Sequence, residues 1–213
     1  MRIVYFFIFF ALIFCININA RATDKEYILE DLLFNEEING EKHSGIKLDV
    51  LDHFLANISK HAGFYPPSFD NSNQRAEVEK KLRDLIEILK IIYTPGKGGT
   101  HCKDPELLLR YGKALSMGHN LDFPESDKEA IKIFESALIL YPNDLMLNYH
   151  YGVFLSDTFL LNQKSIPYLK KAIKLGMKSA KMRLAMVYIS NEQTIKEGEK
   201  TLIEYIQDFL RIL

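Results

Sequence analysis

The pair His101–Cys102 is the first place in the sequence where nucleophilic chemistry could be sought. Cys102 follows His101 directly in a glycine-rich stretch. A cysteine attacks as its thiolate, and a histidine accepts the thiol proton only when the two side chains meet in space. Adjacent side chains of an extended loop point apart, so the simpler interpretation is a loop thiol without a catalytic role. An enzyme with a site near this loop is a lesser alternative.

The segment PGKGGT, residues 95–100, has the composition of a phosphate-binding loop. Such a loop needs a glycine five residues before its Gly-Lys pair, with a strand ahead of it and a helix behind it. Ile91 occupies that glycine position, and Pro105 opens the next predicted helix only later. The prolines and glycines therefore indicate a flexible linker over residues 95–103.

The histidines do not form a metal-binding pattern. None makes a convincing zinc-like pair with another histidine, a second cysteine or a carboxylate. The histidines are His43, His53, His61, His101, His119 and His150. We therefore expect a protein that is not an enzyme and that needs no metal or other cofactor. The formal net charge of -1 also provides no basic field for nucleic acid or for an acidic membrane surface.

Residues 1–20 have the pattern of a secretory signal peptide. Arg2 precedes the uncharged apolar run Ile3–Ile16, and cleavage is expected after Ala20 or Ala22. The run is shorter than the roughly 20 residues that span a bilayer. We therefore expect an exported protein, periplasmic or secreted, with no membrane contact in its mature form. The alternative is an envelope assembly factor that stays tethered to the membrane through an uncleaved N-terminal segment.

Apolar residues behind this segment recur with the helical period of 3.6, and no alternation at period two lasts for the length of a strand. The sequence therefore predicts an all-α protein in two parts. Residues 24–94 are expected to form a region of roughly three helices, the first over Asp24–Ile38 and the second after a turn at Gly40–Gly45. Asn71 or Ser72 is expected to cap the third helix. Residues 104–213 form the second part.

Two patterns recur in residues 104–213. The first places a large, a small and a large residue on one helical face, at Tyr111-Gly112-Leu115, Tyr151-Gly152-Leu155 and Leu184-Ala185-Tyr188. The second places residues four and then three positions apart, at Ala130-Phe134-Ala137, Ser165-Leu169-Ala172 and Gly198-Leu202-Tyr205. Its central residue moves by 35 and then by 33 positions. A period in this range is typical of stacked helical hairpins, in which the small residue lets a neighbouring helix approach closely.

These motifs resemble those of the tetratricopeptide repeat (TPR) family. Tyr-Gly-x-x-Leu, then Ala-x-x-x-Phe-x-x-Ala, then Pro142 follow the TPR order. The residues Ala172, Gly176, Ala180, Leu184, Ala185 and Tyr188 fall in the order of the related Sel1-like repeat. The resemblance covers residues 105–210 and implies a short α-solenoid of about three TPR/Sel1-like hairpins that binds other proteins. Tyr205 suits a terminal repeat, and Ile206, Phe209 and Leu210 are expected to fold back as a C-terminal cap.

The first helices of stacked hairpins line their concave face. The candidate protein-binding groove therefore consists of the first-helix side chains that turn away from the small-residue stripe. These are Leu109, Arg110, Lys113, Tyr149, His150, Val153, Asp157, Met182, Arg183 and Met186. This mixture of apolar, Arg and Lys side chains suits an extended peptide that carries acidic groups. Two outcomes remain open: an exposed groove that binds another protein or peptide, or a groove that the N-terminal helices fill.

Overall fold

The computed structural model describes residues 27–38, 41–94, 103–158 and 162–210 and is mostly helical. Its α-helices are α2 (Leu48–Ala62), α3 (Ser72–Tyr93), α4 (Pro105–Asn120), α5 (Ser126–Leu140), α6 (Leu145–Asp157), α7 (Ile166–Lys174), α8 (Ala180–Ile189) and α9 (Ile195–Leu210). A 3-10 turn, η2 (Asn162–Ser165), precedes α7. The predicted signal peptide and the His101–Cys102 loop lie outside the described residues, as does the predicted linker except for Lys103.

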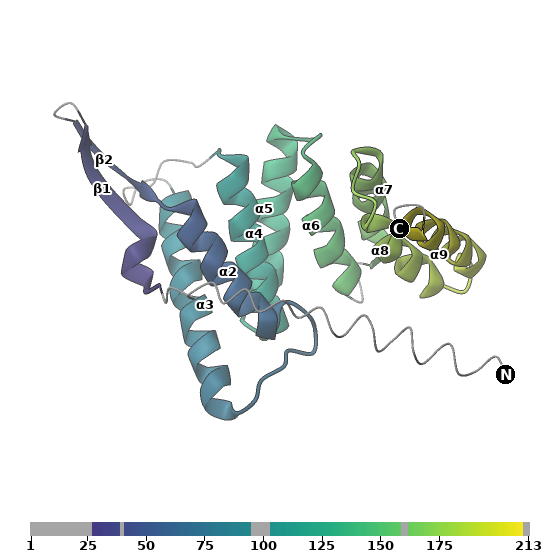
Figure 1. The fold of residues 1–213 in the computed structure, drawn as a ribbon, viewed down its shortest axis with the longest axis horizontal. Coiled ribbons are helices and arrows are strands. Elements are labelled where there is room, and N and C mark those ends of the chain that lie inside the picture. The colour runs from purple at the N-terminus through teal and green to yellow at the C-terminus, as the bar shows by residue number, and fades with distance from the viewer. Residues whose placement is uncertain (1–26, 39–40, 95–102, 159–161, 211–213) are drawn as a thin grey trace.

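The predicted first helix over Asp24–Ile38 is wrong. The described chain starts with a short 3-10 helix, η1 (Leu29–Leu32), and continues as an antiparallel hairpin of β1 (Leu33–Ile38) and β2 (Glu41–Ile46). Its register pairs Leu33 with Ile46 and Ile38 with Glu41. The sequence between the strands is Asn-Gly, the strongest short-range hairpin signal, which outweighs one turn of apolar helical spacing before it. The hairpin projects away from the helices (Figure 1).

Helices α2 and α3 form where the apolar spacing predicts them. The buried stripe of α2 includes Leu51, Leu55 and Ile58, and that of α3 includes Leu82 and Leu85. The Asn71 side chain accepts a hydrogen bond from the Gln74 amide at 3.0 Å, which confirms Asn71 as the cap of α3. Within the described residues, no helix combines the length and the apolar character needed to cross a membrane.

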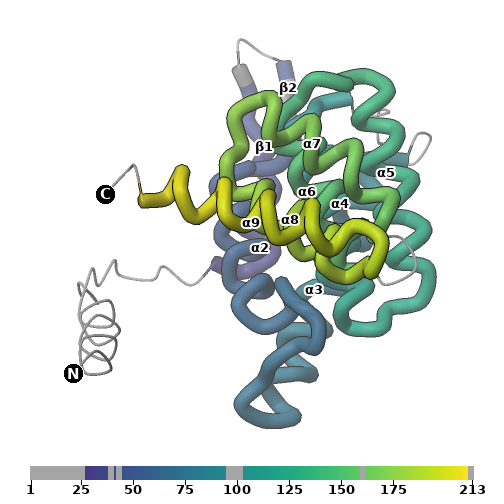
Figure 2. The backbone as a smooth tube through the Cα atoms, turned by 90° about the vertical axis from the view of Figure 1, so that its right-hand side faces the viewer, coloured from purple at the N-terminus to yellow at the C-terminus, as the bar shows by residue number. Residues whose placement is uncertain are grey.

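The remaining helices pack as three successive pairs, α4 with α5, α6 with α7, and α8 with α9. The pairs follow one another across Figure 1, and Figure 2 views them with α8 and α9 in front. Small residues let the helices of a pair approach. A Cβ atom at Gly112 would lie 2.6 Å from the Phe134 ring, and one at Gly152 would lie 2.9 Å from Leu169. The predicted close approach of a neighbouring helix at the small residues is confirmed at both positions.

The end of the third pair differs from the prediction. Helix α9 runs without a break from Ile195 to Leu210, so Ile206, Phe209 and Leu210 do not fold back as a separate cap. They continue along α9 with 47%, 55% and 62% of their surface exposed. The reason lies in the sequence after Gly198, where no glycine or proline breaks the helical run before Leu210.

Candidate functional site

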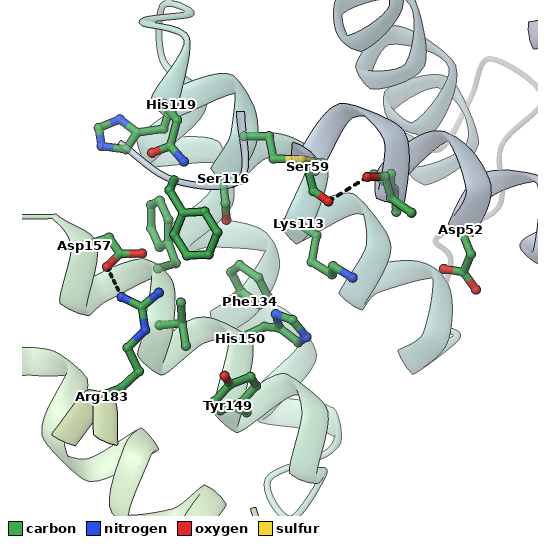
Figure 3. Close-up of a pocket in the computed structure, with 18 residues that line it drawn as sticks. Asp52, Ser59, Lys113, Ser116, His119, Phe134, Tyr149, His150, Asp157 and Arg183 are labelled. Atoms are coloured by element: carbon green, nitrogen blue, oxygen red, sulfur yellow. Dashed lines mark hydrogen bonds and ion pairs between the residues drawn. The ribbon is translucent and has the colours of Figure 1, made fainter. Parts of the chain in front are cut away.

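The N-terminal helix α2 packs against α4 and thereby encloses a cavity of about 540 Å³ with the first helices of the three pairs. The Asn120 side-chain amide of α4 donates to the Ala62 carbonyl of α2 at 2.9 Å and fixes the far end of this contact. The side of the cavity that α2 and the two residues after it supply consists of Asp52, Leu55, Ala56, Ser59, Gly63 and Phe64. Figure 3 shows this cavity with its lining side chains.

Most of the predicted groove residues meet at this cavity. Its lining includes Lys113 of α4, Arg183 of α8, and four residues of α6, namely Tyr149, His150, Val153 and Asp157. Met186 lies next to it, in a smaller depression of about 260 Å³ that Asp157 and Arg183 also line. Helix α2 thus covers one part of the predicted groove, whereas no α2 residue lines the smaller depression.

Three predicted groove residues do not line either space, and their assignment is corrected. Leu109 is only 7% exposed and belongs to the hydrophobic core, because its side chain faces the protein interior and does not line the concave side. Arg110 lies under α2, where it holds Asp52. Met182 is 43% exposed on α8 and lies outside both sets of lining residues.

The cavity has an apolar floor and an aromatic edge. Phe134, Phe154, Leu55 and Met117 supply the buried apolar side chains of its lining. Phe64 follows α2 and is 67% exposed, with the Arg183 guanidinium 5.8 Å from its ring centre. Ligand sites in proteins commonly combine a concave apolar surface with a few placed polar groups.

Two ion pairs at the cavity are internally satisfied. Arg110 donates to both carboxylate oxygens of Asp52, at 2.8 and 2.6 Å, and its third contact is to Glu106 at 2.6 Å. These hydrogen bonds, that of Asp52 first, raise the pKa of Arg110. Arg183 donates to Asp157 at 2.6 Å and joins α8 to α6. Burial raises the pKa of the Asp157 carboxyl, while Arg183 acts in the opposite direction.

Three other polar side chains of the cavity have no such partner. Lys113, Tyr149 and His150 make no hydrogen bond or ion pair with any residue that the structure describes. Burial lowers the pKa of the Lys113 ammonium. Burial, together with the nearby charge of Lys113, lowers the pKa of His150 to about 4. At neutral pH the cavity therefore holds one unpaired cation beside a neutral imidazole and a phenol.

A scan against protein-family models, a search of curated proteins and a search of solved structures each find no match to the chain. The description of the site therefore rests on the geometry of this chain. Among the described residues, no group of three or more His, Cys, Asp and Glu side chains could hold a metal ion. The arrangement can hold an apolar group next to an anion, since its exposed donors lie beside its apolar floor.

The sequence left open whether the N-terminal helices fill the groove, and it identified no α2 residue of this site. The apolar period identifies the buried stripe of α2 but does not say which neighbouring helix its other side chains will face. One signal was present in the sequence. Phe64 and Tyr65 precede Pro66-Pro67 in a segment that cannot be helical, and both are 67% exposed. Exposed aromatic residues in a loop are frequent at binding sites.

Proposed function

We propose that the chain is an exported, non-enzymatic TPR-like scaffold that binds a segment of another protein in the periplasm or the extracellular space. Binding takes place in the cavity between α2 and the first helices of the three pairs. The observation that carries this proposal is the cavity itself, which combines an apolar floor, an exposed aromatic edge and unpaired donors in one concave site.

Two features support a TPR/Sel1-like α-solenoid as the scaffold. The repeated spacing of large and small residues over 105–210 resembles these families. The three helix pairs also contact one another in sequence order. In such a stack the first helices hold the concave face in shape before any partner arrives, so little ordering is required of the receptor when it binds.

The composition of the cavity supports a protein segment as the ligand. Phe64, Phe154 and Tyr149 are aromatic, and aromatic residues contribute much of the binding energy at protein interfaces. Residues 1–20 support export, because they have the pattern of a cleaved signal peptide. N-terminal sequencing of the protein from its host tests this part, with a start at Arg21 or Thr23 expected and a start at Met1 against it.

Partner capture tests the binding site. We expect Val153→Trp to fill the cavity from α6 and to abolish capture of the partner in cross-linking and mass spectrometry, with the helical thermal melt unchanged. The matched control is Ile139→Trp, which adds the same side chain at an 80% exposed position of α5 outside the cavity. Equal capture by both variants would show that the cavity is not the binding site.

Charge reversal of Arg110 is not a suitable probe of the groove. Arg110 ties α4 to α2 through Asp52, and only 12% of its side chain is exposed. Its reversal would place a third carboxylate beside those of Asp52 and Glu106 and loosen the wall of the cavity. Lys113 lines the cavity itself and makes no hydrogen bond or ion pair with a described residue that its substitution would disrupt.

A further inference from the structure

We propose that the cavity recognises an acidic side chain of the bound protein segment next to a large apolar one. Lys113 serves as the counter-ion, and His150 and Tyr149 serve as neutral donors. This inference rests on the proposed function and specifies which chemistry the bound segment must carry.

Lys113 is the residue expected to bind the acid, because no anion among the described residues forms an ion pair with it. It lies on α4 three residues after Arg110 and is partly buried in the cavity wall. Asp52 is the carboxylate close enough to influence it, but both Asp52 oxygens are already bound by Arg110. A partly buried ammonium without a partner is unfavourable, and an anion that enters the cavity would offset this.

Tyr149 and His150 provide further donors at the same side. Their ring centres are 5.2 Å apart, and Figure 3 shows both near Lys113, with Arg183 and Asp157 at the other side of the cavity. Every buried side-chain nitrogen and oxygen of the described residues has a hydrogen-bond partner. The polar atoms of Tyr149 and His150, which have none, are therefore accessible to solvent, and both residues line the cavity. A carboxylate can accept from the lysine, the phenol and the imidazole together.

The apolar floor adds the second requirement. Leu55, Met117, Phe134, Val153 and Phe154 line the same cavity beside the donors. Leu55, Met117, Phe134 and Phe154 are already at most 5% exposed, so Val153 and the edge residue Phe64 are the large apolar side chains that a purely ionic ligand would leave in contact with water. A segment that places a large apolar side chain a few residues from its acid would bury it and satisfy Lys113 at the same time.

The site fits an internal segment of a protein chain. The Asp157–Arg183 pair lines both the cavity and the smaller depression, so the two spaces are adjacent. An extended chain with its acid at Lys113 can therefore run on toward Met186. A nucleic acid would instead require a row of cations along its phosphates, whereas Lys113 is the one unpaired cation among the described residues that line the cavity.

Selection of peptides on the purified protein tests this inference. The probe is a library of random twelve-residue peptides displayed as internal segments. We expect the enriched sequences to carry Asp or Glu within a few positions of Phe, Leu, Ile or Met. For the best peptide, its own Glu→Gln or Asp→Asn version should bind about 10- to 100-fold more weakly, the loss expected for one hydrogen-bonded charge.

A double-mutant cycle then assigns the acid to Lys113. Lys113→Gln should weaken the acidic peptide about 10- to 100-fold and leave the affinity of its amide version nearly unchanged. Lys128→Gln is the matched control, because the Lys128 side chain lies on α5 and is 70% exposed. The peptide substitution tests the same contact without any change to the protein, so a folding defect of the lysine variant cannot hide the result.

Two unfavourable results can be told apart. Enriched peptides that lack acids, or equal binding to the wild type and to Lys113→Gln, would overturn recognition of an acid. In that case the proposed function stands if Val153→Trp still abolishes binding. Failure to enrich any peptide, or binding that survives Val153→Trp, would overturn the proposed function and this inference with it.

Discussion

His150 illustrates how single residues set the properties of the cavity. It lies on α6 with Lys113 nearby, and its surroundings favour the neutral imidazole. A neutral ring next to a lysine donates a hydrogen bond without adding a second positive charge. The same preference has a consequence for folding, because the unfolded chain has no such restriction on the protonation of His150.

We expect the free energy of unfolding to fall as the pH is lowered through the range 6.5 to 4. The pKa of His150 is about 4 in the folded protein and 6.5 as its ordinary value, so the unfolded chain binds more protons between these values. The loss amounts to at most about 3 kcal/mol. Urea unfolding at a series of pH values measures it. His150→Gln is the control, and an unchanged pH dependence in this variant would contradict a buried neutral His150.

Gly112 shows why a small residue is needed where two helices meet. We expect Gly112→Ala to lower the free energy of unfolding by about 1–3 kcal/mol, because its Cβ would lie 2.6 Å from the fully buried Phe134 ring. Denaturant unfolding measures the loss. Phe134→Leu makes room at this point, so the alanine substitution should cost less in that background. An equal cost in both backgrounds would assign the effect to something other than this contact.

Helix packing determines the shape of the cavity at the next scale. The contact between α2 and α4 depends on one ion pair near the start of the helices and on the Asn120–Ala62 hydrogen bond at their other end. The Arg110 side chain is 12% exposed and that of Asp52 is 49% exposed, so water weakens the pair only in part. The wall of the site and the fold are thus held by the same groups.

A double-mutant cycle with Asp52→Asn and Arg110→Gln should give a coupling energy of about 1 kcal/mol, because the pair is bidentate and partly buried. Thermal or urea unfolding of the four proteins measures it. The comparison is the Glu77–Lys81 pair within α3, whose side chains are 63% and 42% exposed. A coupling of about 0.3–0.5 kcal/mol is expected there. A larger coupling within α3 than between α2 and α4 would contradict the stated role of Arg110.

The exposed face of α9 distinguishes the observed continuous helix from a folded-back cap. Phe209→Gln should change the free energy of unfolding by less than about 0.5 kcal/mol, because Phe209 is 55% exposed. A large loss for Phe209→Gln would indicate that the end of α9 packs against the chain.

Gly198→Ala should lower the free energy of unfolding by about 1–3 kcal/mol, since its Cβ would lie 2.8 Å from the Ile189 backbone nitrogen.

Sequence periodicity predicted the helices well and their mutual arrangement less well. The buried stripes of α2, α3 and the paired helices follow directly from apolar spacing, which local backbone geometry converts into one face. The hairpin of β1 and β2 was missed because its turn signal was given less weight than a short apolar stripe. The side of the cavity formed by α2 could not be predicted, because the packing of one helix across another depends on long-range contacts.

At the scale of the whole molecule, two parts of the chain form the cavity. The helix pairs supply the concave face, and the N-terminal part supplies α2 and the exposed Phe64 at its edge. Removal of the N-terminal part would therefore take away one side of the cavity as well as its contacts with α4. The N-terminal part therefore belongs to the proposed binding site.

Site-specific photo-cross-linking in the native host shows directly whether a partner protein binds in the cavity. A photoreactive amino acid is placed at Val153 inside the cavity and, in a second protein, at Ile139 on the exposed face of α5. We expect the Val153 position to form a cross-link to a defined segment of a partner protein and the Ile139 position to form none. No cross-link from Val153, or the same cross-link from Ile139, would contradict the claim that the cavity is where the partner binds.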